Sequence, residues 1–158
     1  MSPLEEAVRE FLSSRRIAVA GVSRTGKSPA DGIFDKLRAA GHEVIPVNPR
    51  AERLHGVPCH PDLRSIPGSA EAVVIATPPE AALGLVRECR ELGIGRVWMH
   101  RSFGRGSVSE EAVRFCREHG ILVIPGACPF MYCAPVDPFH ACLRGILRLT
   151  GGLPNVER

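Results

Sequence analysis

Aromatic side chains are scarce in this sequence. Tryptophan, tyrosine and phenylalanine make up 5% of its 158 residues, with a single Trp and a single Tyr. Proteins that bind single-stranded nucleic acid stack bases on several aromatic rings, so the composition argues against that class. The formal net charge is only +3 at pH 7. Such a charge favours a small anionic ligand and is too low for a nucleic-acid-binding surface.

Long apolar runs are also absent. No segment approaches the roughly 20 apolar residues that a membrane-spanning helix needs. Residues Met1–Glu6 show no basic stretch leading into an apolar one, as a secretory signal would. The six cysteines are spread over a chain long enough to fold without disulfides. We therefore expect a cytoplasmic protein with free thiols and no membrane contact.

Short apolar segments alternate with amphipathic ones along the chain. The apolar segments have the composition of buried parallel strands and cover residues 17–20, 44–47, 72–76, 96–99 and 121–124, with a minor strand at 57–59. Apolar residues at helical spacing predict helices at 2–12, 33–40, 82–89, 107–119 and 137–150. The alternation predicts an α/β, Rossmann-like, doubly wound fold: a mainly parallel sheet of five to six strands with helices on both faces.

One domain is expected to span residues 1–158, with an N-terminal helix in 1–14 and a cysteine-rich C-terminal extension carrying a helix in 126–158. In a doubly wound fold, ligands bind outside the carboxyl ends of the strands. The loops expected at that edge are Gly21–Lys27, Asn48–Arg53, Thr77–Glu80 and His100–Arg105.

The first of these loops has the chemistry of an anion site. It joins a strand to a helix, and its glycines, hydroxyls and cations all suit a phosphate. Gly21–Ser28 also satisfies the P-loop pattern G-x-x-x-x-G-K-[ST]. A P-loop NTPase needs an acidic residue at the end of a neighbouring strand to hold Mg²⁺, and no predicted strand here ends in one. Pro29 and Gly32 are also expected to weaken a helix starting directly after Lys27. An ATP- or GTP-binding protein therefore stays an alternative.

A dinucleotide-binding loop is a weaker match. Its fingerprint needs a second glycine where Ser23 stands and an acidic residue after the second strand. Asn48, Pro49 and Arg50 occupy that second position. An arginine there suits the ribose phosphate that both NADP and coenzyme A carry. An NADP-binding reductase therefore also stays an alternative, as does a glycine-rich turn without a ligand.

The sequence resembles the family of stand-alone coenzyme A-binding proteins, whose fold is similar to the cofactor domain of the succinyl-CoA synthetase alpha subunit. The matching stretches are Ile17–Ser23, Ala40–His42, Val44–Pro49, Gly56–Cys59, Leu92–Ile94, Val97–Met99 and Cys128–Pro129. The chain departs from the family pattern in the loop after Met99 and in the segment after Ile124. Both departures lie at the expected ligand edge.

The resemblance implies non-catalytic binding of coenzyme A or an acyl-CoA. The synthetases act through a phosphohistidine on another domain, so ligase activity is not implied. The implied binding residues are, for the diphosphate, Gly21, Ser23, Arg24, Thr25 and Lys27; for the adenosine and its 3′-phosphate, Asn48, Pro49 and Arg50; and for the pantetheine arm and its thiol end, Thr77, Pro78, His100 and Arg101. Trp98 is expected in the core.

The remaining cysteines and histidines give only weak indications of a function. The set Cys128, Cys133, His140 and Cys142 lacks the C-x-x-C spacing of structural zinc sites, so we predict no metal. Cys128 follows a strand at the ligand edge, and a mixed disulfide with the coenzyme is a hypothesis for it. Four histidines in turns or at helix ends are expected to be solvated: His42, His55, His60 and His119. The apolar face of the C-terminal helix is expected to pack on the sheet or on a second subunit, which leaves a homo-oligomer open.

Overall fold

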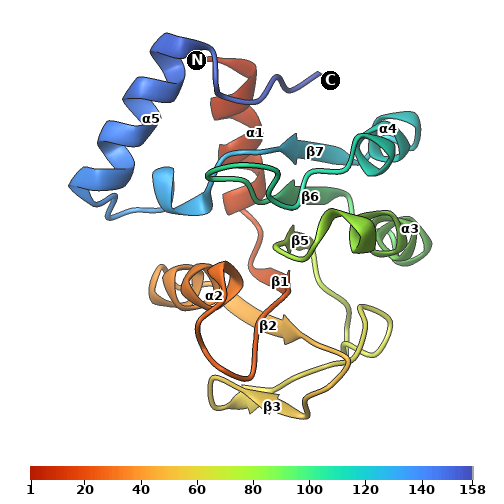
Figure 1. The fold of residues 1–158 in the computed structure, drawn as a ribbon. Coiled ribbons are helices and arrows are strands. Elements are labelled where there is room, and N and C mark those ends of the chain that lie inside the picture. The colour runs from red at the N-terminus through yellow and green to blue at the C-terminus, as the bar shows by residue number, and fades with distance from the viewer. Residues whose placement is uncertain (158) are drawn as a thin grey trace.

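The structure is a computed structural model that describes residues 1–157, and its centre is a five-stranded parallel sheet (Figure 1). The strands lie in the order β2 (Glu43–Val47), β1 (Arg16–Ala20), β5 (Ala72–Ile75), β6 (Arg96–Met99) and β7 (Leu122–Pro125). Each pairs in parallel with its neighbour. The predicted α/β Rossmann-like fold is confirmed. From β1 the chain passes to β2 on one side of it, and it later returns to β5 on the other side. A topological switch point therefore lies between β1 and β5.

Helices cover both faces of the sheet. One face packs against α1 (Pro3–Leu12) and α2 (Pro29–Ala39), and the other packs against α3 (Ala82–Leu92) and α4 (Glu110–Glu118). Alternate residues of each strand enter the two clusters: Ile17 and Val19 face α1 and α2, whereas Ala18 and Ala20 face α3 and α4. Burial on both faces explains why these strands are apolar throughout rather than alternating.

Trp98 joins β6 to the helices of its face. Its ring is fully buried, lies edge-on to Phe11 of α1 with 5.4 Å between ring centroids, and donates an Nε1 hydrogen bond of 2.9 Å to the Gly126 carbonyl. A buried indole needs such a partner for its N–H. The prediction that Trp98 belongs to the core is confirmed.

Two helix starts differ from the sequence prediction. The helix predicted from Ile33 begins at Pro29, because Ser28 and Asp31 form a capping box and proline is well suited to the first helical position. Pro29 therefore starts this helix, and the prediction that it weakens the helix was wrong. The helix predicted from Ser107 begins at Glu110, since the Ser109 side chain caps it.

The minor strand predicted near Val57 is half of a small hairpin, β3 (Arg53–Leu54) and β4 (Val57–Pro58). Its two turn residues, His55 and Gly56, both have a left-handed backbone, with φ of 51° and 76°. A two-residue turn of this kind suits the twist of a hairpin. Figure 1 shows the hairpin beside the loop that follows β1.

A single-turn 3₁₀ helix, η1 (Pro79–Ala81), follows β5. In the C-terminal segment another, η2 (Pro129–Met131), precedes α5 (Pro138–Thr150). No residue of α5 is buried. Leu143 and Leu147 pack on a small cluster around Met131, while other apolar side chains of the helix face outward. Within residues 1–157, no helix is long and apolar enough to cross a membrane.

Candidate functional site

The loop after β1 starts with a close approach between two strands. Gly21 has a φ of 106°, and a Cβ atom added there would lie 2.4 Å from the carbonyl oxygen of Ala76, at the end of β5. Only glycine permits both features. Gly21 therefore lets the loop cross the carboxyl end of β5, which is the switch point where doubly wound folds bind their ligands.

A buried carboxylate organises this loop. Asp31, in the first turn of α2, is 2% exposed and accepts hydrogen bonds from the Ser23 hydroxyl at 2.6 Å and the Ser28 hydroxyl at 2.7 Å. It also accepts from the backbone N–H of Ser28 at 2.8 Å, and more weakly from that of Ser23 at 3.3 Å. Its burial alone would raise the pKa, but hydrogen bonds from His55, Ser23 and Ser28 outweigh it and lower the pKa to about 2.

His55 completes the network from the hairpin turn. Its Nε2 lies 2.7 Å from Asp31, its Nδ1 lies 3.0 Å from Asp35, and its ring packs on Phe34 with 4.8 Å between centroids. The prediction that His55 is solvated was wrong, since its side chain is 14% exposed. His55 thus joins the hairpin to α2. Because Asp31 also accepts a hydrogen bond from Ser23, the hairpin is connected through Asp31 to the glycine-rich loop.

This network separates the loop from a P-loop. The first turn of a P-loop helix presents its N–H groups to phosphate, whereas here the Asp31 carboxylate already accepts from the cap residue Ser28. Ser28, the last residue of the P-loop pattern, is thus the N-cap of α2 and forms a capping box with Asp31. Ser23 and Thr25 are joined by their hydroxyls at 3.0 Å, and the Ser23 hydroxyl is directed to Asp31.

Three cations surround this loop. Arg24, Lys27 and Arg50 are exposed, and within the described residues none of their charged side chains has a hydrogen-bonding or ion-pair partner. Asn48 fixes the loop that carries Arg50: its side-chain amide donates to the Val22 carbonyl at 2.9 Å, and its Oδ1 accepts from the Arg50 backbone at 2.7 Å. Asn48 therefore ties the ends of β1 and β2 together and keeps these cations at one edge.

A pocket of about 530 Å³ adjoins the loop at the ends of β5 and β6. The pocket is lined by residues of α2, the loops after β5 and β6, and the segment around η2: Pro29, Ile33, Ala76, Thr77, Pro78, His100, Ser102, Phe103, Gly106, Ser107, Cys128, Phe130 and His140. Its polar groups are few. His100 is 8% exposed, and its Nε2 lies 3.1 Å from the Ser102 hydroxyl. Burial lowers the pKa of His100, so the ring is neutral at pH 7.

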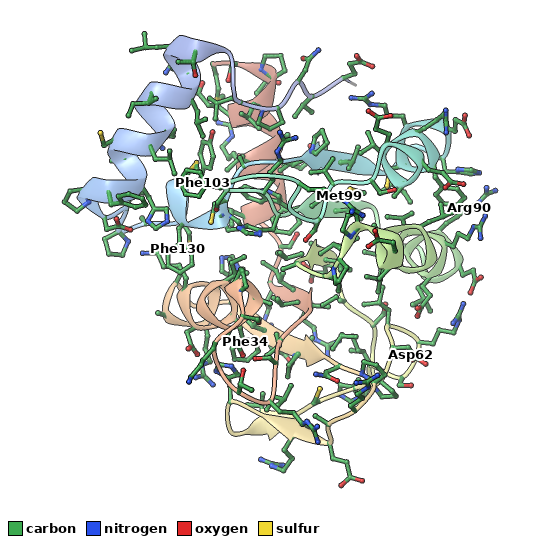
Figure 2. All side chains as sticks on the ribbon, viewed as in Figure 1. Phe34, Asp62, Arg90, Met99, Phe103 and Phe130 are labelled. Carbon is green, nitrogen blue, oxygen red and sulfur yellow. The ribbon has the colours of Figure 1, made fainter. Side chains whose placement is uncertain are left out.

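The C-terminal segment closes one side of the pocket. Phe130 stacks on His140 with 5.0 Å between centroids, and His140 Nδ1 lies 2.6 Å from Asp137, the N-cap of α5. Figure 2 shows Phe130 and Phe103 on the side of the sheet where α5 begins. The sequence marked His140 only as a candidate metal ligand. Within residues 1–157, no three Cys, His, Asp or Glu side chains are grouped to hold a metal.

Cys128 reaches the pocket, but not as a reactive thiol. It is 3% exposed, and burial raises its pKa. A thiol that attacks a disulfide must ionise readily, so the geometry counts against the mixed-disulfide hypothesis. All six cysteines are free: Cys59, Cys89, Cys116, Cys128 and Cys133 are buried and Cys142 is exposed.

The predicted binding residues gather at one edge with one exception. Thr77, Pro78 and His100 line the pocket. Gly21 lies against Ala76 and Thr77 at its edge, and Asn48 is bonded in turn to the Val22 carbonyl of the glycine-rich loop. Arg101 is exposed and lines a different hollow, formed with Leu147 and Pro154. The backbone N–H of Arg101 donates to the Ala127 carbonyl at 3.0 Å.

The sequence model of the CoA binding domain matches residues 15–134, which include both loops and most of the pocket. The chain belongs to this family. It is 30% identical over 128 residues to the uncharacterized protein YneT of Bacillus subtilis, covering 80% of this chain and 92% of that one. It is also 31% identical to the alpha subunit of ADP-forming acetate–CoA ligase II of Pyrococcus furiosus, but covers only 27% of that subunit against 75% of this chain.

A solved structure of a hypothetical protein from Pyrococcus horikoshii has the same fold. It superposes with a TM-score of 0.73 at 27% identity, covering 79% of this chain and 86% of that chain. The chain thus matches YneT over nearly the whole of that protein, and it spans only about a quarter of the much longer ligase subunit.

Several site residues were missed from the sequence alone. The Ser28-x-x-Asp31 spacing is a capping-box signal that would have placed the helix start and the buried carboxylate. The partnership of Asp31 with His55 joins residues 24 positions apart, and no local pattern predicts it. The same holds for Phe103 and Phe130, which meet at the pocket only through the tertiary fold.

Proposed function

We propose that this protein binds coenzyme A or an acyl-CoA without catalysing its conversion. The observation that carries the proposal is that two different binding environments lie side by side at one edge of the sheet. Unpaired cations surround the glycine-rich loop, and an uncharged pocket follows directly beside it. Coenzyme A has the matching shape: a nucleotide with three phosphates at one end and a long neutral arm ending in a thiol at the other.

The nucleotide end lies over the glycine-rich loop in this proposal. Because Asp31 occupies the inner face of the loop, the diphosphate is held from outside by Arg24 and Lys27 together with Thr25 and the backbone near Gly21 and Ser23. Asn48, Pro49 and Arg50 face the adenosine, and Arg50 carries the charge for the 3′-phosphate. Charge-assisted bonds of this kind are about twice as strong as neutral ones.

The pantetheine arm passes Thr77 and Pro78 and ends near His100. These residues sit at the carboxyl ends of β5 and β6 and line the pocket. Arg101 is left out of the thiol end because its side chain lies in the other hollow. Membership in the CoA binding domain family supports the ligand, and the match with a ligase subunit covers too little of that subunit to carry its activity.

Calorimetric titration tests the proposal. Coenzyme A, 3′-dephospho-coenzyme A, ATP with Mg²⁺ and NADPH are titrated in turn, and coenzyme A is expected to bind most tightly. If ATP–Mg²⁺ or NADPH bound and coenzyme A did not, the nucleotidase or reductase alternative would replace this proposal.

A pair of arginine variants locates the nucleotide. Arg50→Ala is expected to weaken coenzyme A binding about tenfold, the low end for losing a hydrogen bond to a charged group. It should affect 3′-dephospho-coenzyme A much less. Arg90→Ala is the matched control, since Figure 2 shows Arg90 on α3, away from the pocket. Equal losses for the two variants would mean only a general effect of charge.

A further inference from the structure

The pocket beside the glycine-rich loop is built to exclude charge. Its lining contains no Lys, Arg, Asp or Glu side chain within the described part of the chain. Two histidines also line the pocket, and each already has a polar partner. His100 is buried with Ser102 as a partner, and His140 is paired through Nδ1 with Asp137, which is not itself part of the lining.

Most of the remaining lining is apolar. Ile33 is fully buried in α2, Phe130 is half-buried against His140, and Pro29, Ala76 and Pro78 add aliphatic surface. A coenzyme A thiol needs only a narrow channel at the end of its arm. A lined volume of about 530 Å³ is that of an ordinary small-molecule site, so it offers room beside the arm for a further group.

Phe103 stands at the rim of this pocket. This residue is 71% exposed, which is unusual for a phenylalanine, and it belongs to the loop between β6 and α4. Gly104 and Gly106 follow it with left-handed φ values of 64° and 58°. An apolar ligand in the pocket would bury part of this ring and gain binding free energy in proportion to the area covered.

We propose that this pocket receives a short, uncharged acyl group, so that the ligand is a coenzyme A thioester rather than free coenzyme A, with Phe103 as a specificity-determining residue. The proposal rests on the coenzyme A-binding function above. A carboxylate at the end of the acyl group would lose its hydration without gaining a cation, so acidic thioesters are disfavoured. Each methylene that is fully buried contributes about 0.8 kcal/mol, which is about a fourfold gain in affinity.

Calorimetry with four ligands tests the proposal: coenzyme A, acetyl-CoA, butyryl-CoA and succinyl-CoA. Butyryl-CoA carries two more methylenes than acetyl-CoA, so it should bind up to about sixteenfold more tightly. Succinyl-CoA has the same number of acyl carbons as butyryl-CoA but ends in a carboxylate, and it should bind at least about tenfold more weakly than butyryl-CoA because the charge is unpaired.

Two exposed phenylalanines supply matched variants. Phe103→Ala is expected to reduce the preference for butyryl-CoA over coenzyme A, measured as the ratio of the two affinities in the same variant, by at least about threefold. Phe139→Ala removes a ring that is 62% exposed and does not line the pocket, and it should leave the preference intact. Circular dichroism checks that both variants are folded.

The outcomes separate the two proposals. Coenzyme A binding with no gain for butyryl-CoA, or equal binding of butyryl-CoA and succinyl-CoA, overturns the acyl-pocket proposal and leaves the proposed function intact. Equal effects of Phe103→Ala and Phe139→Ala overturn the role of Phe103. If neither coenzyme A nor any thioester binds, the proposed function itself fails.

Discussion

Asp31→Asn is expected to cost this protein a large share of its stability. In the folded protein the pKa of this carboxyl lies at about 2, against an ordinary value of 3.8. One pKa unit corresponds to 1.36 kcal/mol, so the charged form of Asp31 contributes about 2.5 kcal/mol. For a domain of this size, such a loss lowers the melting temperature by about 5–10 °C.

The same carboxylate predicts the response to acid. A folded pKa below the unfolded one means that the contribution of Asp31 is fully present above about pH 4 and is lost as the pH falls toward 2. Urea unfolding at pH 7, 5 and 3 should therefore show wild type losing stability between pH 5 and 3 more steeply than Asp31→Asn does.

Asp35→Asn is the control for this experiment. Asp35 also contacts His55, but its side chain is 54% exposed, and exposed ion pairs contribute at most about 1 kcal/mol. If Asp31→Asn costs less than Asp35→Asn, or keeps the acid response of wild type, the account of Asp31 as the organiser of the loop is refuted.

Two further predictions follow from the backbone and the thiols. Gly21→Ala should destabilise the protein by several kcal/mol in urea unfolding, because its Cβ would overlap the Ala76 carbonyl, whereas Gly41→Ala, also at positive φ but in open space, should cost only about 1–2 kcal/mol; similar costs for both would refute the close approach. Alkylation of the native protein should modify Cys142 first, since the other five cysteines are buried, and mass spectrometry showing rapid modification of Cys128 would contradict its burial.

The fold could be predicted from the sequence because its signals are local. Strands buried on both faces produce apolar runs such as Val73–Ile75, and the capping residues Ser2 and Asp137 mark their helices. The edge of the sheet where we propose that the ligand binds follows from the parallel arrangement of the strands. The start of α2 was missed because Pro29 was treated as a helix breaker, although at the first turn a proline has no hydrogen bond to lose.

The site was predictable only in part. The cations Arg24, Lys27 and Arg50 follow from their position after predicted strands, and Thr77 and His100 follow in the same way. Other features depend on contacts between separate segments of the chain. These are the hydrogen bond from Ser23 to Asp31, the contact of His55 with Asp31, and the position of Arg101 in a different hollow. Such contacts leave no periodic or motif signal in a single sequence.

Amide chemical-shift mapping by NMR with saturating coenzyme A tests the central claim most directly. The account predicts shifts of the amides in Gly21–Lys27 and at Asn48, Arg50, Thr77 and His100, since these surround the proposed nucleotide and arm sites. The hollow at the other end of the molecule, near Gly120–Leu122, should not respond. Shifts confined to that hollow, or none at millimolar coenzyme A, would contradict the claim.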